Sequence, residues 1–253
     1  MVTVSTDALA LRRTPFGETS QIVEFLTRDH GRLSLILKGV HRERSHMGGA
    51  VDLLDHARVS YFARRGSRSM ALLRERRAVR HHAGLRSRED LLAAGLWLVE
   101  LLQSLAPEGQ AVPAMFDLAT ACLEALDARP APAQVPLIVL ALEAGLLRMT
   151  GFQPVLDRCV SCDRRPSGHK VLRCDLERGG IVCSACREPE DASFPLGAAA
   201  AQLVDELAVT DPREIRDVLP TSIENDLRRF HDRTWTHVLE RRPRVAAVFA
   251  RET

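Results

Sequence analysis

The sequence predicts an α+β protein of several domains, and three features of its 253 residues support this fold class. Strand-like segments separated by turns fill about the first 80 residues, and helical periodicity begins near Ser87. Periodicity is lost from residue 152 to residue 188, where five of the six cysteines lie. We therefore expect a small barrel domain (1–83), a helical domain (84–151), a cysteine ribbon (152–190) and a continuation of the helical domain (191–253).

The barrel domain contains five short segments that are rich in apolar and β-branched residues and are joined by glycine-bearing turns. The expected strands are Val2–Thr14, Ile22–Thr27, Leu33–Leu37, Ala57–Phe62 and Met70–Leu73. Five strands in so short a stretch favour a small closed barrel, and the five-stranded OB-fold fits best. An SH3-like barrel remains an alternative on pattern alone.

Apolar residues recur at helical spacing from Ser87 onward. Ser87 followed three residues later by Asp90 predicts a capped helix start, and Pro107 with Gly109 ends that helix. Further helices are expected at Pro113–Ala128, Val135–Thr150, Leu196–Ala208 and Ser222–Leu239. The faces of the first three helices are almost purely aliphatic, which indicates a helical core, and Cys122 fits that core as a small buried residue.

Charge is distributed unevenly along the chain. Residues 1–83 carry 15 Lys and Arg against 8 Asp and Glu, whereas the remainder carries 20 against 25. A basic N-terminal third favours contact with a polyanion such as nucleic acid. The barrel region has few aromatic residues, so we expect backbone electrostatics to dominate over base stacking. The candidate DNA-binding residues are Arg12, Arg13, Arg32, Lys38, Arg42, Arg44, Arg64, Arg65 and Arg68.

The cysteine ribbon contains two Cys-x-x-Cys pairs, Cys159 with Cys162 and Cys183 with Cys186, separated by 20 residues. This spacing is typical of a zinc site with four thiolate ligands, in which each pair forms one knuckle. Gly179-Gly180 allows the tight turn that a ribbon hairpin needs. We expect one structural Zn²⁺ held by these four cysteines. Cys174 is expected to be structural, and His169 is a weaker spare candidate.

No catalytic pattern stands out. Four thiolates close the zinc shell and leave no position for a reactive water. The chain has no HExxH motif, no nucleophile elbow and no phosphate-binding glycine-rich loop. We therefore expect a protein that is not an enzyme. The N-terminus does not have the pattern of a signal peptide, and no apolar run is long enough to span a membrane, so a cytoplasmic, nucleoid-associated protein is expected.

Motifs in the N-terminal domain resemble the RecO family of bacterial recombination mediators. The matching segments are Leu9–Val23, Leu26–Ser34, Lys38–Arg42, Ser45 and Gly48–Gly49. The segment Glu177–Cys186 is similar to that family's Gly-Gly-x-x-Cys-x-x-Cys, and Cys174 then falls where the family has an apolar residue. The order of barrel, helices and inserted ribbon also matches along nearly the whole chain.

The resemblance implies binding to single- and double-stranded DNA and annealing of complementary strands. It also implies contact with the acidic tail of single-stranded DNA-binding protein, and loading of the RecA recombinase together with RecR. We expect the tail site on the helices between Ser87 and Thr150, with Arg148 as a carboxylate partner or simply a helix C-terminal charge. Two alternatives remain: a zinc-ribbon accessory factor of transcription or translation, and a metalloenzyme.

Overall fold

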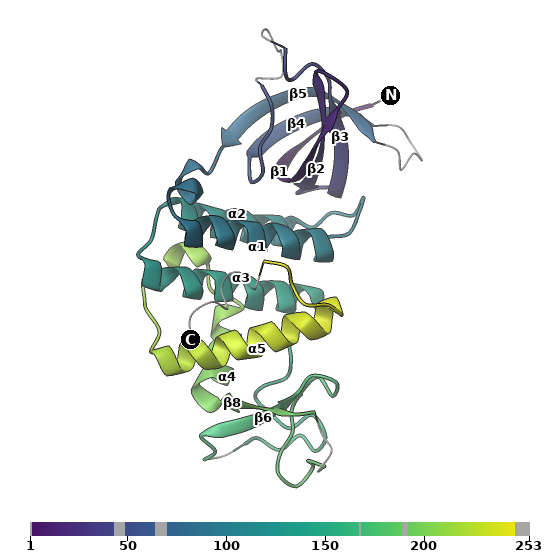
Figure 1. Ribbon diagram of the computed structural model, residues 1–253. Helices are drawn as coiled ribbons and strands as arrows, with labels where there is room; N and C mark the ends of the chain where they lie inside the picture. Colours follow the sequence, from purple (N-terminus) through teal and green to yellow (C-terminus); the bar gives the residue numbers. More distant parts are fainter. Residues whose placement is uncertain (1, 43–48, 64–69, 167, 189–191, 246–253) are drawn as a thin grey trace. The chain divides into compact units, whose positions relative to one another are not determined.

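A computed structural model of the chain describes residues 2–42, 49–63, 70–166, 168–188 and 192–245 (Figure 1). The chain divides into two compact units, Met1–Asp127 and Ala128–Thr253. The first unit contains the barrel and the next two helices. The second contains the remaining helices and the cysteine ribbon.

The first unit begins with a closed barrel of five strands in the order β1-β2-β3-β5-β4. The strands are β1 (Val2–Phe16), β2 (Ser20–Thr27), β3 (Gly31–Leu37), β4 (His56–Ala63) and β5 (Ala71–Arg80). The barrel closes because β1 is long enough to pair with β4 through its first half and with β2 through its second. The prediction of five strands is confirmed, although β5 continues seven residues past the expected end at Leu73.

Small and branched apolar side chains fill the barrel. Phe25 and Tyr61 are both buried there, together with Val23, Leu35 and Val59. Phe16, by contrast, is 45% exposed at the β1–β2 turn. Alternation along the strands therefore directs Phe25 and Tyr61 into the core, whereas Phe62 is only partly buried.

Two helices follow the barrel in the same unit, α1 (Glu89–Leu105) and α2 (Pro113–Asp127), after the 3-10 turn η1 (Ala83–Ser87). The predicted cap at Ser87 is wrong. Arg88 is the N-cap residue and makes no side-chain cap hydrogen bond. The Ser87 hydroxyl instead donates to the Gly84 carbonyl at 2.6 Å, which stabilises η1, and the Arg88 guanidinium pairs with Asp90 at 2.6 Å.

The β2–β3 turn is hydrogen-bonded to the loop between α1 and α2. The Arg32 amide donates to the Pro107 carbonyl at 2.8 Å, and the Arg32 Nε donates to the Ala106 carbonyl at 2.7 Å. The Val112 amide donates to the Arg28 carbonyl at 3.2 Å. These bonds tie the barrel to its helices and explain why both belong to one compact unit.

Gly31 lies close to the backbone of the α1–α2 loop in this joint, and its position gives a stability prediction. Its φ is +62°, and a Cβ there would lie 2.3 Å from the Pro107 carbonyl oxygen. Gly17 has a similar φ of +63° but open space around it. Gly17→Ala should lower the free energy of unfolding by about 1 kcal/mol through backbone strain alone. Gly31→Ala should lower it by roughly 2 kcal/mol more, because the added methyl group is overpacked.

Urea unfolding of the full chain, followed by circular dichroism, measures both alanine variants. Equal losses at the two glycines would show that the α1–α2 loop moves aside at little cost. In that case the joint would not hold the barrel against its helices.

The second unit packs three helices and a small sheet. The helices are α3 (Val135–Thr150), α4 (Ala198–Leu207) and α5 (Thr221–Leu239), and the strands are β6 (Val171–Asp175), β7 (Gly180–Ile181) and β8 (Phe194–Gly197). Short 3-10 turns lie at η2 (Pro132–Gln134) and η3 (Pro212–Glu214). The helix expected from Leu196 instead begins at Ala198, because Leu196 pairs with Leu172 between β8 and β6.

Helix α3 is the most apolar helix of the second unit, and it ends at Gly151 with φ +79°, as the glycine predicted. Within the described residues, Pro132–Thr150 is the one segment long and apolar enough to cross a membrane. Two thirds of that segment, 67%, is buried inside the structure. A core helix of a folded protein has the same properties, so the segment is weak evidence for a membrane span.

Candidate metal centre and nucleic-acid interface

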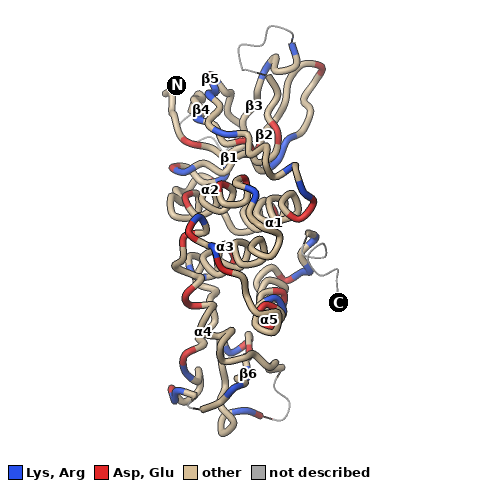
Figure 2. The backbone as a smooth tube through the Cα atoms, turned by 90° about the vertical axis from the view of Figure 1, so that its left-hand side faces the viewer, with Lys and Arg blue, Asp and Glu red and all other residues tan. Residues whose placement is uncertain are grey.

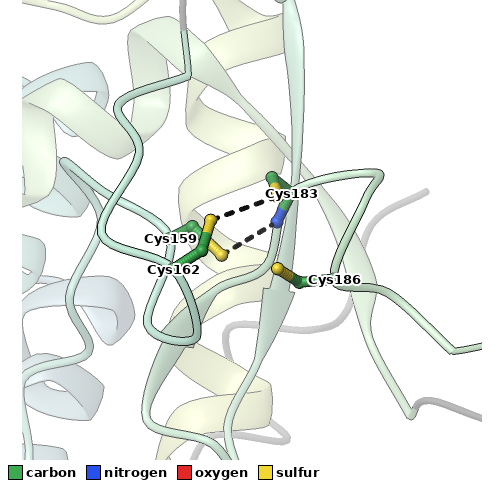
Figure 3. A group of neighbouring side chains, drawn as sticks. All are labelled: Cys159, Cys162, Cys183 and Cys186. Atoms are coloured by element: carbon green, nitrogen blue, oxygen red, sulfur yellow. Dashed lines mark hydrogen bonds between the residues drawn. The ribbon is translucent and has the colours of Figure 1, made fainter.

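Two loops of the second unit bring four cysteines together (Figure 3). The Sγ atoms of Cys159, Cys162, Cys183 and Cys186 all lie within 4.8 Å of one another. Those of Cys162 and Cys183 are 3.7 Å apart. A tetrahedral ion with metal–sulfur bonds of about 2.3 Å would separate its ligands by about 3.8 Å. The geometry therefore fits a four-coordinate metal ion, and the four cysteines could hold one.

Backbone hydrogen bonds hold the first knuckle against β7. The Val160 amide donates to the Ile181 carbonyl at 2.9 Å, and the Ile181 amide donates to the Val155 carbonyl at 2.9 Å. Gly180 makes this approach possible, because a Cβ there would lie 2.3 Å from the Val155 carbonyl oxygen. The Gly179-Gly180 pair thus provides a turn, with φ +80° at Gly179, and also a close backbone contact.

The electrostatics of the four thiols favour a bound cation. Burial alone would raise the pKa of Cys159, but amides of Cys183, Ser161 and Cys162 outweigh it and lower the pKa to about 6. Hydrogen bonds to the neighbouring thiols of Cys162 and Cys183 raise the pKa of Cys186 to about 12. The four groups therefore cannot all be thiolates at neutral pH unless a cation balances their charge.

Cys174 lies outside this group, as predicted. It is fully buried in β6, where it pairs with Ile181. Burial, followed by the charge of Asp175, raises the pKa of its thiol to about 12, so it remains neutral and behaves as a small apolar side chain. His169 is exposed and is likewise outside the described group of four.

Several of the predicted DNA-binding residues gather at one end of the barrel. Arg12 and Arg13 lie on the part of β1 that extends beyond its pairing with β4, and both are exposed. Lys38 and Arg42 follow β3 and are also exposed. The loop after β3 packs against the β1–β2 turn, because the His41 amide donates to the Thr19 carbonyl at 3.2 Å.

The predicted arginines differ in their neighbours. Arg13 pairs with Asp52 at 3.0 Å. Arg32 is only 24% exposed and contacts Glu24 at 3.3 Å as well as the Ala106 carbonyl, so its guanidinium already holds the barrel joint. The side chains of Arg12, Lys38 and Arg42 form no ion pair with any described residue. Four of the predicted positions, Arg44, Arg64, Arg65 and Arg68, lie outside the described residues.

The basic residues of β5 were not among those predicted from the sequence. Arg74, Arg77 and Arg80 are exposed on this strand, and Arg58 on β4 pairs in register with Arg77. Figure 2 shows Lys and Arg positions along β4 and β5. The Arg-Glu-Arg-Arg run after Leu73 was the available indication, but the strand was expected to end before it.

Some of the arginines on β4 and β5 are paired with neighbouring acids. Arg58 pairs with Asp7 at 2.8 Å, and Arg80 lies 3.6 Å from Asp127. Arg86, just beyond the strand, pairs with Asp52 at 2.7 Å. Exposure alone therefore does not identify a phosphate-binding residue on this protein.

Comparison with known proteins covers nearly the whole chain. Residues 1–81 match the family model described as Recombination protein O N terminal, and residues 86–245 match Recombination protein O C terminal. The chain is 30% identical to the DNA repair protein RecO of Anaeromyxobacter dehalogenans (strain 2CP-C) over 239 residues, which cover 89% of this chain and 92% of the relative.

A second relative, the DNA repair protein RecO of Desulforudis audaxviator (strain MP104C), is 28% identical over 255 residues, covering 96% of this chain and 94% of the relative. That of Myxococcus xanthus (strain DK1622) is 31% identical over 192 residues, covering 75% and 76%. These matches confirm the resemblance found in the sequence motifs. The chain belongs to the RecO family of DNA repair proteins.

Proposed function

We propose that the protein is a recombination mediator that binds single- and double-stranded DNA and anneals complementary strands. With RecR, it helps load RecA onto DNA coated with single-stranded DNA-binding protein. The observation that carries this proposal is the match to both RecO family models along nearly the whole chain. We place its action in the cytoplasm, at the nucleoid.

The barrel is proposed to be an OB-fold that leads DNA binding. Its five strands close in the order β1-β2-β3-β5-β4, with a single parallel contact between β3 and β5. Arg12, Lys38 and Arg42 gather near the β1–β2 turn, where loops of such barrels contact nucleic acid. Phosphate contacts of this kind leave the bases exposed, which suits annealing because the bases must pair with a second strand.

The four-cysteine site is proposed to bind one structural Zn²⁺. Four thiolates in a small tetrahedral site are the ligand set that zinc prefers, and they leave no open position for catalysis. When bound, the ion would link the two knuckles and fix the ribbon. We propose accordingly that the protein acts by binding and not as an enzyme. A zinc-ribbon accessory factor of transcription or translation is not favoured by the family matches.

Contact with the acidic tail of single-stranded DNA-binding protein is proposed for the end of α3. Arg148 is exposed in the last turn of this helix, and Met149 and Phe152 beside it are 45% and 52% exposed. A cation next to exposed apolar side chains suits an acidic, apolar peptide that ends in a carboxylate. The charge of Asp205 interacts with that of Arg148, and the peptide would compete with this carboxylate.

A strand-annealing assay tests the proposed function. The full-length protein is mixed with two complementary oligonucleotides coated with the cognate single-stranded DNA-binding protein, and duplex formation is followed by fluorescence. We expect annealing well above the uncatalysed rate at low salt, and a decline as salt rises, because phosphate contacts release counterions. Tight binding to RNA without annealing of DNA would favour the accessory-factor alternative instead.

A further inference from the structure

We propose that the cysteine ribbon carries a second phosphate-binding site, made of Arg164, Arg165 and Lys170, that holds the backbone of a DNA strand. We name these three residues the basic ribbon loop. The inference rests on the proposed function, because it takes DNA as the ligand. It goes beyond that function by giving the second unit its own contact with nucleic acid.

The local charge of the ribbon is the first observation. The eleven residues from Arg164 to Cys174 contain four cations and no acid, although the ribbon as a whole holds similar numbers of both. Arg173, the fourth cation, is already engaged, because its guanidinium donates to the Ser193 carbonyl at 2.6 Å. The other three are the residues of the basic ribbon loop, and all three are exposed.

The pairing of nearby charges is the second observation. Arg158 contacts Asp163 at 3.4 Å, and Arg178 contacts Glu188 at 3.8 Å. Asp163, which directly precedes Arg164 in the chain, is thus already paired with another arginine. Among the residues that the structure describes, no ion pair is formed by Arg164, Arg165 or Lys170. Three cations that form no ion pair attract a polyanion more strongly than surface arginines that are paired with acids.

The backbone of the loop is anchored at both ends, which is the third observation. The Cys159 amide donates to the Arg164 carbonyl at 2.9 Å, so the first arginine is fixed to the knuckle. The Ala198 amide donates to the Lys170 carbonyl at 2.9 Å, so the lysine is fixed to the start of α4. Cations on an anchored backbone lose less conformational entropy when they bind phosphates than cations on a free tail.

A second contact of this kind has a clear use in annealing. Two complementary strands repel each other through their phosphates, and a protein that neutralises only one strand leaves the other fully charged. The barrel end would bind one strand and the basic ribbon loop another. Neither contact reads bases, so both strands remain free to pair.

The test compares two full-length variants with the same loss of charge. The ribbon variant carries Arg164→Ser, Arg165→Ser and Lys170→Ser. The control carries Arg58→Ser, Arg80→Ser and Arg86→Ser, which removes three exposed arginines that are paired with acids. Binding to a single-stranded oligonucleotide is measured over a range of salt concentrations, and annealing of two uncoated strands is measured in parallel.

In the ribbon variant we expect the slope of log affinity against log salt to become less steep by about 2, because each of the three lost phosphate contacts contributes about 0.7 to that slope. Its annealing rate should fall about tenfold, while the control changes little in either measurement. Zinc content should equal that of the wild type. Loss of zinc would mean that the three cations balance the negative charge of the thiolates, and it would overturn the inference.

The other outcomes separate the inference from the proposed function. Wild-type protein that binds and anneals DNA, with a ribbon variant indistinguishable from the control, would overturn the second site and leave the function standing. Wild-type protein that binds no DNA at low salt would remove the proposed function, and the second site with it.

Discussion

Cys159→Ser is expected to abolish metal binding and to unfold the ribbon. Cys159 is buried and accepts a hydrogen bond from the Cys183 amide at 3.3 Å, so it is the most deeply embedded of the four thiols. Its pKa of about 6 makes it a thiolate at neutral pH, whereas a serine hydroxyl stays protonated. Structural zinc contributes about 10–16 kcal/mol to domains of this type, and the few strand pairs of the ribbon cannot replace that stabilisation.

Elemental analysis and limited proteolysis measure the two effects. The wild type should carry one zinc ion per chain and resist cleavage in the ribbon, and Cys159→Ser should carry none and be cleaved there. Cys174→Ser is the matched control, because Cys174 is equally buried but lies outside the cluster. Loss of zinc from the Cys174 variant would refute the assignment of ligands, whatever the result at Cys159.

Local chemistry explains which parts of the fold could be predicted. The Cys-x-x-Cys spacing determines the knuckle geometry, so the four cysteines that the structure brings together could be identified from the sequence. Helix α3 was predicted with its observed bounds, because Gly151 stops it by adopting the left-handed conformation. The barrel strands were found from their apolar alternation and turn residues.

The remaining elements depend on tertiary contacts that no local pattern reveals. Strand β5 extends to Arg80 because β4 supplies partners for its polar half. Leu196 belongs to β8 and not to a helix because β6 lies beside it. Ser87 fails as a helix cap because its hydroxyl binds the Gly84 carbonyl in the preceding turn. In each case the competing contact comes from a neighbouring element or turn.

The same limit applies to the DNA-binding residues, because a sequence shows where the charges are but not which acids neutralise them. Arg13 illustrates the point. Partial burial would raise the pKa of Asp52, but the Leu53 amide, Arg86 and Arg13 outweigh it and hold that pKa below its usual value. Asp52 therefore stays ionised beside Arg13 and Arg86, and its single negative charge is shared between these two guanidinium groups. Arg12, Lys38 and Arg42 form no ion pair with any described residue, although Glu24 lies opposite Arg12 across the β1–β2 pair, where it contacts Arg32 instead.

Combined substitution of Arg12, Lys38 and Arg42 with serine is therefore expected to weaken single-strand binding more than any other triple change in the described barrel. At about 1 kcal/mol for each lost phosphate contact, affinity should fall about 100-fold at low salt. The slope of log affinity against log salt should become less steep by about 2. Both effects should be the same for different base sequences, because contacts to phosphate carry no sequence information.

Fluorescence anisotropy with full-length protein measures both the affinity and its dependence on salt. The charge-matched control carries Arg58→Ser, Arg80→Ser and Arg86→Ser, and it distinguishes local contact with phosphates from long-range attraction. Both triple variants remove three positive charges. The three control arginines are paired with acids, so we expect their removal to eliminate no phosphate contact. A large loss in the first variant with little loss in the control would place DNA at the β1–β2 end of the barrel. Equal losses in both would mean that DNA responds only to net charge, and the proposed contact at this end would then be wrong.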